Sequence, residues 1–597
     1  MQIVSRSDLQ AVSDSIRGHP FLGLDTETTG LKQSDKPFLV IVATPKQTYL
    51  FNLQEYEGMS RDLVLTPKEV GDALDCVFLP GTITFIQNAK FDMRMVKHLG
   101  IEVHNPWCTY AVERVLRNNF TGDRAYSLDA IAKRRFDGFE KEESVKKYIS
   151  KNKLYDLVDV PGKAKKQREE HYELVPRDIM WSYAARDAEL HLKIGMQQIE
   201  ELDKDEGLQR VAKNELKLTK TCYKMERHGI TVDKAYVARA LSHEMKLITN
   251  ARRDFEERTG REYVDSNKLF ADIFTGAGLE YPKTAKGNPS FNADSLETID
   301  NDVAKLIKKV RNHEKRAGTY YSSFLYYAGQ GSTIHPDVRQ AGTETGRFSY
   351  RDPNLQNVPK EDKDGLEFYV RKCFVPSPGN CLVMIDYSQM EFAVMADYSG
   401  EAKLIEQINQ GTDVHTATAN LLGISRTQAK TINFGLLYGM GQAKLAADLG
   451  VSVKEAKGIK LDYFGKLPRV ERFIRQVIKT GETRGHVFNW LGRKCYIDHR
   501  DFAYILPNHL VQGSCGDIVK LSMNRIDSYL KNYKAAQIIQ IHDEIVFDVP
   551  PDELHIIPDI VKIMEAAYEP RNGVQLKCTV EHSYKSWGHP DKIKGAP

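Results

Sequence analysis

The spacing of hydrophobic and polar positions changes several times along the chain. From about residue 20 to 200, alternating and continuous apolar runs are mixed with helical periodicity, which predicts an α/β domain. Residues 131–178 interrupt this pattern with a run rich in lysine and glutamate, which we interpret as a solvated helical excursion. Residues 205–330 have a helical and polar pattern, and strands alternate with helices again after residue 335. At 597 residues the chain is too long for one core, so we expect about four domains.

Composition and charge narrow the classes of protein. With 41% hydrophobic and 28% charged residues, the chain has an ordinary globular composition. Because 84 basic residues nearly balance 81 acidic ones, any nucleic-acid surface must be local. The eight cysteines lack CxxC spacing, which favours reduced thiols and a cytoplasmic protein. The sequence has no signal peptide and no run of roughly 20 apolar residues, so we expect no membrane role.

One predicted helix, over residues 302–321, is strongly basic on part of its surface. It carries Lys305, Lys308, Lys309, Arg311, Lys315 and Arg316. Such a run is usually a solvated helix face, but it could also contact a phosphate backbone. The sequence leaves both interpretations open.

A first pair of acids follows an apolar strand in the segment FLGLDTETTGL. The period of two places Asp25 and Glu27 on one side of the strand while Thr26 points away. Two neighbouring carboxylates repel each other unless a cation holds them, and oxygen-only ligands favour Mg²⁺ or Mn²⁺. Ordinary surface acids are the alternative explanation of this pair alone.

Two further segments add ligands of the same kind. In QNAKFD, Asn88 and Asp92 have the spacing of one helix face, and in YAARD, Tyr183 and Asp187 repeat it. Together with DTETTGL, these blocks resemble the three exonuclease motifs of the DnaQ-like 3′→5′ proofreading domains. The resemblance implies a ribonuclease H-like fold and two metal ions. The implied ligands are Asp25, Glu27, Asp92 and Asp187, and Tyr183 would orient the attacking water.

A second group of acids lies in the C-terminal half. An apolar strand over residues 381–385 ends at Asp386. Much later, AAQIIQIHDEIVFDVP predicts a β-hairpin with His542, Asp543 and Glu544 at its turn. Adjacent acids at a buried turn indicate a nearby cation.

Between these acids, the segment RTQAKTINFGLLYGMG predicts a helix with a cationic end and an aromatic end. Arg426, Lys430, Phe434 and Tyr438 recur every four residues and share a stripe roughly 120° wide. The cations suit a triphosphate, and the rings suit a base and sugar. An amphipathic helix with a snorkelling basic end is the alternative.

Together the three blocks resemble motifs A, B and C of the family A DNA polymerases, the bacterial DNA polymerase I type. The resemblance implies a right-hand polymerase with palm, fingers and thumb. It also implies two Mg²⁺ ions, which Mn²⁺ can replace, held by Asp386, Tyr387 and Asp543, with Glu544 as an auxiliary acid. The implied substrate-binding residues are Arg347, Gln389, Glu391, His415, Arg426, Lys430, Phe434, Tyr438, Asn508, Gln512 and His542.

Several of these residues have specific implied roles. Arg347 would contact the primer terminus, and His415 the incoming triphosphate. Asn508 and Gln512 would lie near the nascent base pair and the template. Glu391 matches the family's steric gate against a ribose 2′-hydroxyl. Phe434, where some relatives have tyrosine, predicts discrimination against dideoxynucleotides.

The resemblance also implies a domain layout, in an α/β multidomain chain. We expect a 3′→5′ exonuclease domain over residues 1–204, a thumb over 205–334, the palm over 335–400 and 501–597, and fingers over 401–500. The first motif begins within 25 residues of the N-terminus, so we expect no 5′ nuclease. The expected partners are primer-template DNA and dNTPs, with helicase or primase as further replication partners of a monomeric bacteriophage replicase.

The sequence departs from the family pattern at three positions. Phe392 and Ala393 stand where relatives commonly have Leu-Arg, and Tyr504 replaces a usual arginine, so we expect the template grip to come from other residues. A single-subunit RNA polymerase and a non-catalytic DNA-binding protein are the rival classes. Glu391 and the complete ligand sets favour a proofreading DNA polymerase.

Overall fold

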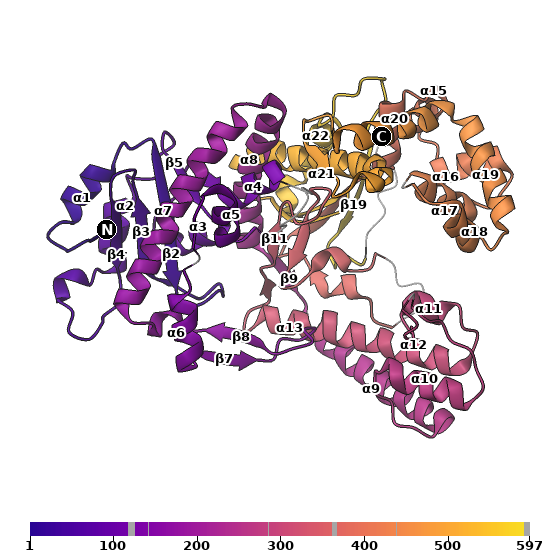
Figure 1. Ribbon diagram of the computed structural model, residues 1–597, viewed down its shortest axis with the longest axis horizontal. Coiled ribbons are helices and arrows are strands. Elements are labelled where there is room, and N and C mark those ends of the chain that lie inside the picture. The colour runs from indigo at the N-terminus through magenta and orange to yellow at the C-terminus, as the bar shows by residue number, and fades with distance from the viewer. Residues whose placement is uncertain (118–125, 141, 285, 361–366, 438, 590–597) are drawn as a thin grey trace.

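The protein has one α/β lobe and two helical lobes around a central sheet (Figure 1). The computed structural model describes residues 1–117, 126–140, 142–284, 286–360, 367–437 and 439–589. The N-terminal lobe lies on the left in Figure 1, a helical arm extends to the lower right, and a second group of helices lies at the upper right. The expected α/β multidomain architecture is confirmed.

The N-terminal lobe is built on a six-stranded mixed sheet of order β1-β4-β3-β2-β5-β6. In that sheet β2 runs antiparallel to β3 and parallel to β5. Its strands are β1 (Gln2–Ile3), β2 (Phe21–Thr28), β3 (Pro37–Ala43), β4 (Thr48–Asn52), β5 (Ile83–Ile86) and β6 (Pro106–Cys108). Its helices are α1 (Leu9–Ile16), α2 (Pro67–Leu74), α3 (Lys90–Lys97), α4 (Thr109–Arg117), α5 (Leu128–Arg135), α6 (Ser144–Asn152) and α7 (Arg177–Leu202).

Helices cover both faces of this sheet, which explains why its central strands are continuously apolar. Val40 and Val42 of β3 pack with α1, α2 and α3, whereas Leu39 and Ile41 pack with α7. Helix α7 approaches β2 closely, since a Cβ on Gly23 would lie 2.3 Å from the carbonyl oxygen of Ala188. A glycine is therefore required where the helix crosses the strand.

The interpretation of residues 131–178 as a helical excursion is wrong for its second half. After α5 and α6 the chain forms an antiparallel hairpin of β7 (Tyr155–Val158) and β8 (Gln167–Glu170). Arg168 stacks 3.8 Å from the centre of the Tyr155 ring, and Gly162 has the positive φ of 79° that the connection requires. The charge run masked these strands because cross-strand pairs, not periodic apolar positions, stabilise the hairpin.

Residues 205–330 are mainly helical, as predicted. They form α8 (Glu206–His228), β9 (Ile230–Val232), α9 (Lys234–Thr259), α10 (Asn267–Gly276), α11 (Ala293–Glu297), α12 (Asp302–Lys315), a π-helical stretch (Arg316–Ser322) and α13 (Ser323–Ala328). The arm of α9–α12 has its own aromatic core around Phe255, Phe270 and Phe291. In contrast, α8 contributes Leu218 and Cys222 to the large central core.

The basic helix α12 pairs most of its cations with acids of the same arm. Lys305 lies 2.7 Å from Asp300 and Lys308 lies 2.8 Å from Glu297. Arg311 reaches Asp265 at 2.6 Å. These ion pairs favour the solvated-face interpretation over a phosphate-binding helix.

The central sheet is antiparallel, with order β17-β18-β14-β19. Its strands are β14 (Cys381–Tyr387), β17 (Ala536–Ile541), β18 (Glu544–Val549) and β19 (Cys578–Ser583). The sheet packs with α14 (Met390–Ser399), α21 (Leu506–Tyr529) and α22 (Ile557–Glu565). Four short strands precede it in the chain: β10 (Thr333–Ile334), β11 (Asp337–Arg339), β12 (Ser349–Arg351) and β13 (Phe374–Val375).

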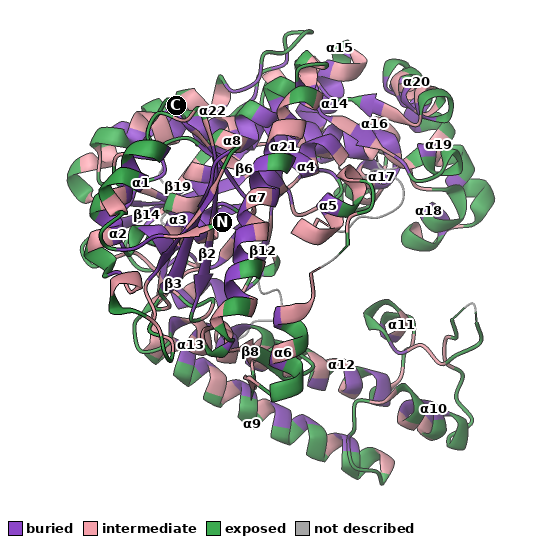
Figure 2. Ribbon diagram, turned by 60° about the vertical axis from the view of Figure 1, so that its left-hand side comes forward, coloured by how far each residue is buried: buried purple, intermediate pink, exposed green. Residues whose placement is uncertain are grey.

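The helices at the upper right of Figure 1 lie between the two halves of this sheet in the sequence. They are α15 (Ala402–Asn409), α16 (Val414–Leu422), α17 (Arg426–Leu437), α18 (Gln442–Leu449), α19 (Val453–Lys466) and α20 (Pro468–Arg484), followed by a hairpin of β15 (His486–Phe488) and β16 (Lys494–Tyr496). Figure 2 shows β2, β3 and α21 mostly buried, whereas α9 and α10 alternate between buried and exposed positions and α18 is largely exposed. Among the described helices, none combines the length and apolar character needed to cross a bilayer.

Candidate active sites

Three elements of the N-terminal lobe bring four predicted acids together. Strand β2 supplies Asp25 and Glu27, helix α3 supplies Asp92, and helix α7 supplies Asp187. Glu27 and Asp92 are buried, and Asp25 is within electrostatic range of the other three carboxylates. The packing of α7 on β2 therefore brings Asp25 and Asp187 together, although they are 162 residues apart in the sequence.

Burial and mutual repulsion disfavour charge on these four groups. Burial, followed by repulsion from the neighbouring acids, raises the pKa of Asp25 and of Glu27 well above their usual values. Burial raises the pKa of Asp92 and of Asp187 to about 7. Four crowded oxygen donors with raised pKa values fit the chemistry of a divalent cation site.

The local geometry around Asp92 differs from the prediction. Asn88 has a φ of 55°, and α3 begins only at Lys90, so Asn88 and Asp92 do not share a helix face. The four-residue spacing suggested a shared helix face, but Asn88 has a left-handed backbone conformation and lies before the helix begins. The predicted pattern places Thr26 on the side of the strand opposite Asp25 and Glu27. In the structure the Thr26 hydroxyl nevertheless donates a hydrogen bond to Asp92 at 2.7 Å.

Tyrosines border the same four acids. Tyr183 lies one turn before Asp187 on α7, and hydrogen bonding between them opposes the rise in the pKa of Asp187. Burial raises the pKa of Tyr183, so its hydroxyl keeps its proton at neutral pH. Sequence reasoning missed Tyr56 and Tyr172, whose pKa values are raised by burial and also by the charge of Glu27. In the described part of the chain, the buried Tyr56 hydroxyl has no hydrogen-bond partner.

His191 was also missed, although it lies one turn after Asp187. Its Nδ1 lies 2.8 Å from the carbonyl oxygen of Leu24, the residue before Asp25. Burial lowers the pKa of His191 to about 4, so the ring is neutral and donates to that carbonyl. This bond fixes α7 against β2 next to the acids, and a lone histidine in an apolar pattern gives no sequence signal of it.

The second predicted group of acids assembles at one end of the central sheet. Strand β14 contains Asp386, and β17 and β18 form the predicted hairpin, whose turn is His542-Asp543. Asp386 is the cross-strand partner of Glu544, and the Tyr387 amide donates to the carbonyl oxygen of Asp543 at 3.2 Å. The structure therefore brings Asp386, Asp543 and Glu544 together.

Tyr387 and His542 are distinguished by their backbone and burial. The Tyr387 hydroxyl is buried against Ser522 and the carbonyl of Met564, both at 2.7 Å, so only its main chain can face a metal. His542 takes a φ of 54° in the two-residue turn and is exposed. Burial, and then the charge of Asp386, raises the pKa of Asp543 to about 7.

Cationic and indole groups that the sequence did not single out contact these acids. Lys360 Nζ lies 2.9 Å from Asp386, and Arg371 lies 3.3 Å from Glu544. The Trp587 indole N–H donates to Glu544 at 3.0 Å, and the Arg371 guanidinium stacks 3.9 Å from the Trp587 ring. Glu544 is thus an acid held by protein donors.

Helix α17 carries the predicted cations in its N-terminal half and the predicted Phe434 near its C-terminal end. Arg426 and Lys430 are exposed, and Phe434 is half-buried. Arg426 pairs with Asp413 at 2.6 Å, and Tyr438 lies outside the described residues. The Phe434 ring lies 5.3 Å from His415 and 5.5 Å from Phe392.

Phe392, one of the departures from the family pattern, completes an aromatic cluster. Its ring lies 5.4 Å from that of His415 in an edge-on arrangement. Burial lowers the pKa of His415, whose Nδ1 lies 3.1 Å from the amide nitrogen of Asn433. Tyr504, the other large departure, is exposed.

The remaining predicted substrate residues lie on the loop before β12, at the start of α14 and on α21. Arg347 pairs with Glu391 and donates to the Gln512 carbonyl at 3.2 Å. The side-chain oxygen of Gln389 accepts a hydrogen bond at 2.6 Å from the Val414 amide, at the start of α16. Asn508 lies one turn before Gln512 on α21, and its side-chain oxygen is buried without a hydrogen-bond partner among the described residues.

In the described residues, the carboxylate side chains of neither site are close enough together to form a ready-made metal-binding group. Among the residues that the structure describes, no three His, Cys, Asp or Glu side chains form a metal-binding group. The donor chemistry nevertheless fits divalent cations, because each site gathers carboxylates whose charges lack full compensation. The individual metal contacts therefore stay predictions.

Comparison with known proteins agrees with this combination of two sites. Residues 235–589 match the family described as DNA polymerase family A, and residues 1–202 match a 3′-5′ exonuclease family. The chain belongs to DNA polymerase family A and carries an N-terminal 3′-5′ exonuclease domain. Both families generally use divalent metal ions.

Two relatives and one solved structure illustrate the similarity. DNA polymerase I of Borreliella burgdorferi is 26% identical, with 98% of this chain and 64% of the relative covered. DNA polymerase DpoZ of Salmonella phage PMBT28 is 26% identical, with 89% and 91% covered. The solved POL domain of Pol1 from M. smegmatis, in complex with DNA primer-template and dNTP, has a TM-score of 0.81 at 23% identity, with 98% of this chain and 99% of that chain covered.

The chain matches only part of the length of several relatives, so similarity alone does not assign it the activity of the whole relative. This chain spans 64% of the Borreliella enzyme and about half of other curated DNA polymerase I relatives, such as one with 49% covered. The solved structure, at 23% identity, supports the fold.

Proposed function

We propose that this protein extends DNA primers on a DNA template with dNTPs and removes misincorporated nucleotides by 3′→5′ hydrolysis. The observation that carries the proposal is that two separate sets of carboxylates each assemble from distant segments. One set lies on the exonuclease domain and the other on the sheet of the polymerase domain. Two chemistries in one chain need two such sites.

For synthesis, Asp386 and Asp543, with the main chain of Tyr387, would hold two Mg²⁺ ions. Bound Mg²⁺ would lower the pKa of the primer 3′-hydroxyl and stabilise the leaving pyrophosphate. Arg426, Lys430 and His415 would bind the triphosphate, since two of them are exposed cations on the helix that follows His415.

Arg347, Asn508 and Gln512 would contact the primer terminus and the nascent pair. Minor-groove acceptors are nearly the same for every correct pair, so these side chains can test geometry without reading sequence. The orphaned oxygen of Asn508 supports this role, because a substrate could satisfy it. Gln389 would hold the loop ahead of α16, and His542 and Tyr438 would line the same substrate site.

Sugar selection would depend on Glu391 and Phe434. Glu391 is held in place by Arg347, so its side chain could crowd a ribose 2′-hydroxyl. Phe434 lacks a hydroxyl that could replace a missing 3′-hydroxyl. Incorporation of dideoxynucleotides should therefore increase in Phe434→Tyr, and an unchanged ratio of dideoxy to deoxy incorporation would refute this assignment.

For proofreading, Asp25, Glu27, Asp92 and Asp187 would hold two further Mg²⁺ ions. Those ions would activate the attacking water and stabilise the departing 3′ oxygen. Tyr183, whose hydroxyl keeps its proton, would orient the water through a rigid ring.

We also propose the domain assignment and the biological setting. The thumb would cover residues 205–334, the fingers 401–500, and the palm 335–400 and 501–597. We propose a monomeric bacteriophage replicase that works with helicase or primase, and the coverage of 91% of a phage DNA polymerase supports the viral setting. A primer-template and a dNTP bound to the structural relative support the same substrates here.

The test is primer extension and 3′ degradation of a labelled primer by two variants. Asp543→Ala should abolish synthesis and spare degradation, whereas Asp25→Ala should do the reverse. Loss of both activities in either variant, with the fold intact by circular dichroism, would contradict the assignment of two independent sites.

A further inference from the structure

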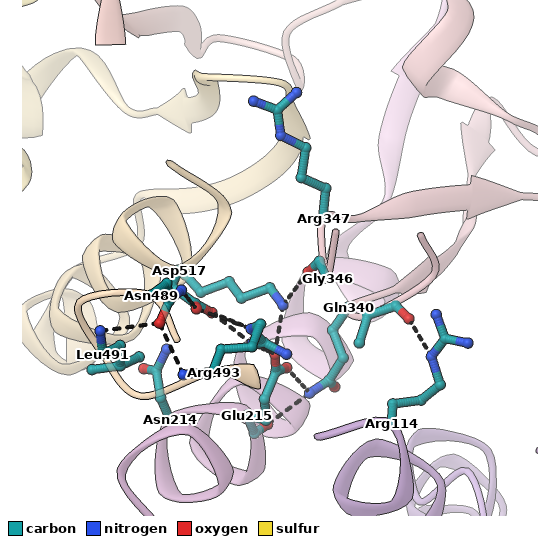
Figure 3. A network of polar contacts seen from close by, with 12 residues as sticks. Arg114, Asn214, Glu215, Gln340, Gly346, Arg347, Asn489, Leu491, Arg493 and Asp517 are labelled. Atoms are coloured by element: carbon teal, nitrogen blue, oxygen red, sulfur yellow. Dashed lines mark hydrogen bonds and ion pairs between the residues drawn. The ribbon is translucent and has the colours of Figure 1, made fainter. Parts of the chain in front are cut away.

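The loop of residues 340–347 connects β11 to β12 and ends at Arg347. Two cationic side chains donate three hydrogen bonds to the main-chain carbonyl oxygens of this loop. Arg114 reaches the oxygens of Ala341 and Thr343, at 2.8 and 2.9 Å, and Lys520 reaches that of Gly346 at 2.6 Å. Figure 3 shows the Arg114 side chain below Gly346, while the Arg347 side chain extends away from it.

Arg114 belongs to the exonuclease domain, on helix α4. Its guanidinium stacks 4.4 Å from the centre of the Tyr126 ring, and its fork divides between the two carbonyls. A planar fork held by a ring and two acceptors has little freedom, which suits it for fixing a backbone. The exonuclease domain therefore holds part of the polymerase domain in place.

A second cation of the exonuclease domain acts just ahead of the loop. The buried Lys90 of α3 donates to the carbonyl of Val338 at 2.7 Å and lies 3.2 Å from Asp337. It also pairs with Glu226 of α8. The contacts of Lys90 and Arg114 thus follow one continuous stretch of backbone, from β11 to Thr343.

The opposite side of the loop rests on a buried ionic network. Lys520 of α21 pairs with Glu215 of α8, which also accepts from Arg493 at 2.5 Å. Arg493 pairs in turn with Asp517 at 2.6 Å. All four side chains are fully buried, so each depends on the others for compensation of its charge. The network is a rigid base for the Gly346 end of the loop.

The anchored backbone determines where Arg347 can reach. Gly346 has a φ of 80°, and a Cβ there would lie 3.1 Å from the Arg493 guanidinium, so this turn packs directly on the network. From the next residue, Arg347 extends to Glu391 and to the carbonyl of Gln512. A shift of the loop would move the guanidinium relative to the proposed primer terminus.

We propose that Arg114 of the exonuclease domain is a positioning residue for primer extension, acting through the loop of residues 340–347 on Arg347. The proposal rests on the proposed function. It means that the exonuclease domain contributes to synthesis without its own hydrolytic chemistry. Arg114 contacts neither set of acids, so its effect on synthesis is separable from proofreading.

The test compares Arg114→Ala with Arg117→Ala. Arg117 lies on the same helix and pairs with Glu201 of the exonuclease domain at 2.6 Å, so it is a matched control. Arg114→Ala should lower kcat/KM for primer extension by about 10-fold, because loss of precise placement costs that order of rate. Degradation of a single-stranded oligonucleotide should stay within about 2-fold of the wild type for both variants. Equal losses of both activities in Arg114→Ala, or an equal loss of extension in Arg117→Ala, would overturn the proposal.

A double-mutant cycle with Arg347→Ala tests the route of the effect. In the Arg347→Ala background, Arg114→Ala should reduce extension by no more than about 2-fold further, since the side chain being positioned is already absent. If the two losses multiply, Arg114 acts by another route and the proposal fails. Arg114→Lys, which keeps the charge without the fork, should give an intermediate loss and serves if the alanine variant does not fold.

Hydrogen exchange of the loop separates this inference from the proposed function. Amides of residues 341–347 should exchange about 10-fold faster in Arg114→Ala than in Arg117→Ala, whatever activity the wild type has. Unchanged exchange in the loop would contradict the positioning role. A wild type that neither extends nor degrades a primer would instead contradict the proposed function.

Discussion

The two acidic sites of this protein differ in what surrounds their carboxylates. In the exonuclease domain, four acids crowd together and the bordering side chains include Tyr56, Tyr172 and Tyr183. At the central sheet, Lys360 and Arg371 contact Asp386 and Glu544 directly. At the first site Arg94, Arg186 and Lys146 act on Asp92 and Asp187 through charge alone, with no ion pair to them among the described residues. At the second site, protein cations contact the acids.

This difference teaches how each site depends on metal. Buried carboxylates with raised pKa values hold protons until a cation replaces them, so the exonuclease site must obtain most of its positive charge from bound ions. At the polymerase site, Lys360 and Arg371 offset part of the acidic charge, although burial still raises the pKa of Asp543 and of Glu544. We therefore expect the exonuclease to be more sensitive to metal and pH than the polymerase.

The largest effect should come from removing one hydroxyl at the exonuclease site. Tyr183→Phe should lower the rate of single-strand degradation by about 100-fold, because the water would lose its orienting partner. Primer extension should be unchanged. Quenched-flow digestion of a labelled oligonucleotide measures the loss, and Tyr172→Phe, which borders the same acids, is the matched control. Equal losses in the two variants would mean that Tyr183 has no special role.

The next effect concerns the pH dependence of metal binding. The pKa values of Asp92 and Asp187 are raised to about 7, so these groups lose their protons only as the pH rises through that value. Metal affinity should therefore fall as the pH drops from 8 to 6, by up to about 10-fold per unit for each proton displaced. At the polymerase site Asp543 shows the same rise, whereas Lys360 is bonded to Asp386. The half-saturating Mg²⁺ concentration should rise more steeply for degradation than for extension, and parallel slopes would break the comparison.

A smaller effect is expected on stability without metal. Asp187→Asn removes one carboxylate from a crowded set, so it should stabilise the metal-free protein by about 1 kcal/mol, or roughly 2 °C in Tm. Because a raised pKa in the folded state costs stability where the group is ionised, the gain should be largest at pH 8 and shrink as the pH falls through about 7. Asp386→Asn loses its ion pair with Lys360 and should show no gain. Calorimetry in EDTA distinguishes the two, and a gain in both variants would contradict the proposed difference.

The smallest effect should follow Lys360→Ala. Its side chain is 62% exposed, so its bond to Asp386 is weakened by solvent. We expect the half-saturating Mg²⁺ concentration for extension to change by about 2- to 3-fold, with degradation unaffected. Titration of both activities in the same preparation measures this, and a change in degradation alone would refute the role of Lys360.

The sequence was sufficient for elements whose signals are local. The hairpin turn at Asp543 and the helix starting at Arg426 have the predicted form, and the apolar strand that leads to Asp386 forms but continues to Tyr387. Short-range periodicity determines these elements. The assembly of four acids from β2, α3 and α7 followed only from the family resemblance, since spacing alone cannot bring Asp25 to Asp187.

The features that were missed depend on tertiary packing. Lys90 and Arg114 contact backbone carbonyls more than 200 residues away, and such contacts leave no pattern in the sequence. The Glu215–Arg493 pair joins segments 278 residues apart. The sequence predicts a helix where β7 and β8 form a hairpin, because charged residues conceal alternation in an exposed strand.

The most direct test of the central claim follows the conversion of dNTP to dNMP on a matched primer-template. This turnover needs insertion at one site and removal at the other. We predict that the wild type converts dNTP steadily, that Asp543→Ala and Asp25→Ala each abolish the conversion, and that an equimolar mixture of the two variants restores part of it as the primer exchanges between them. Steady conversion by either variant alone would contradict the existence of two separate, complementary sites.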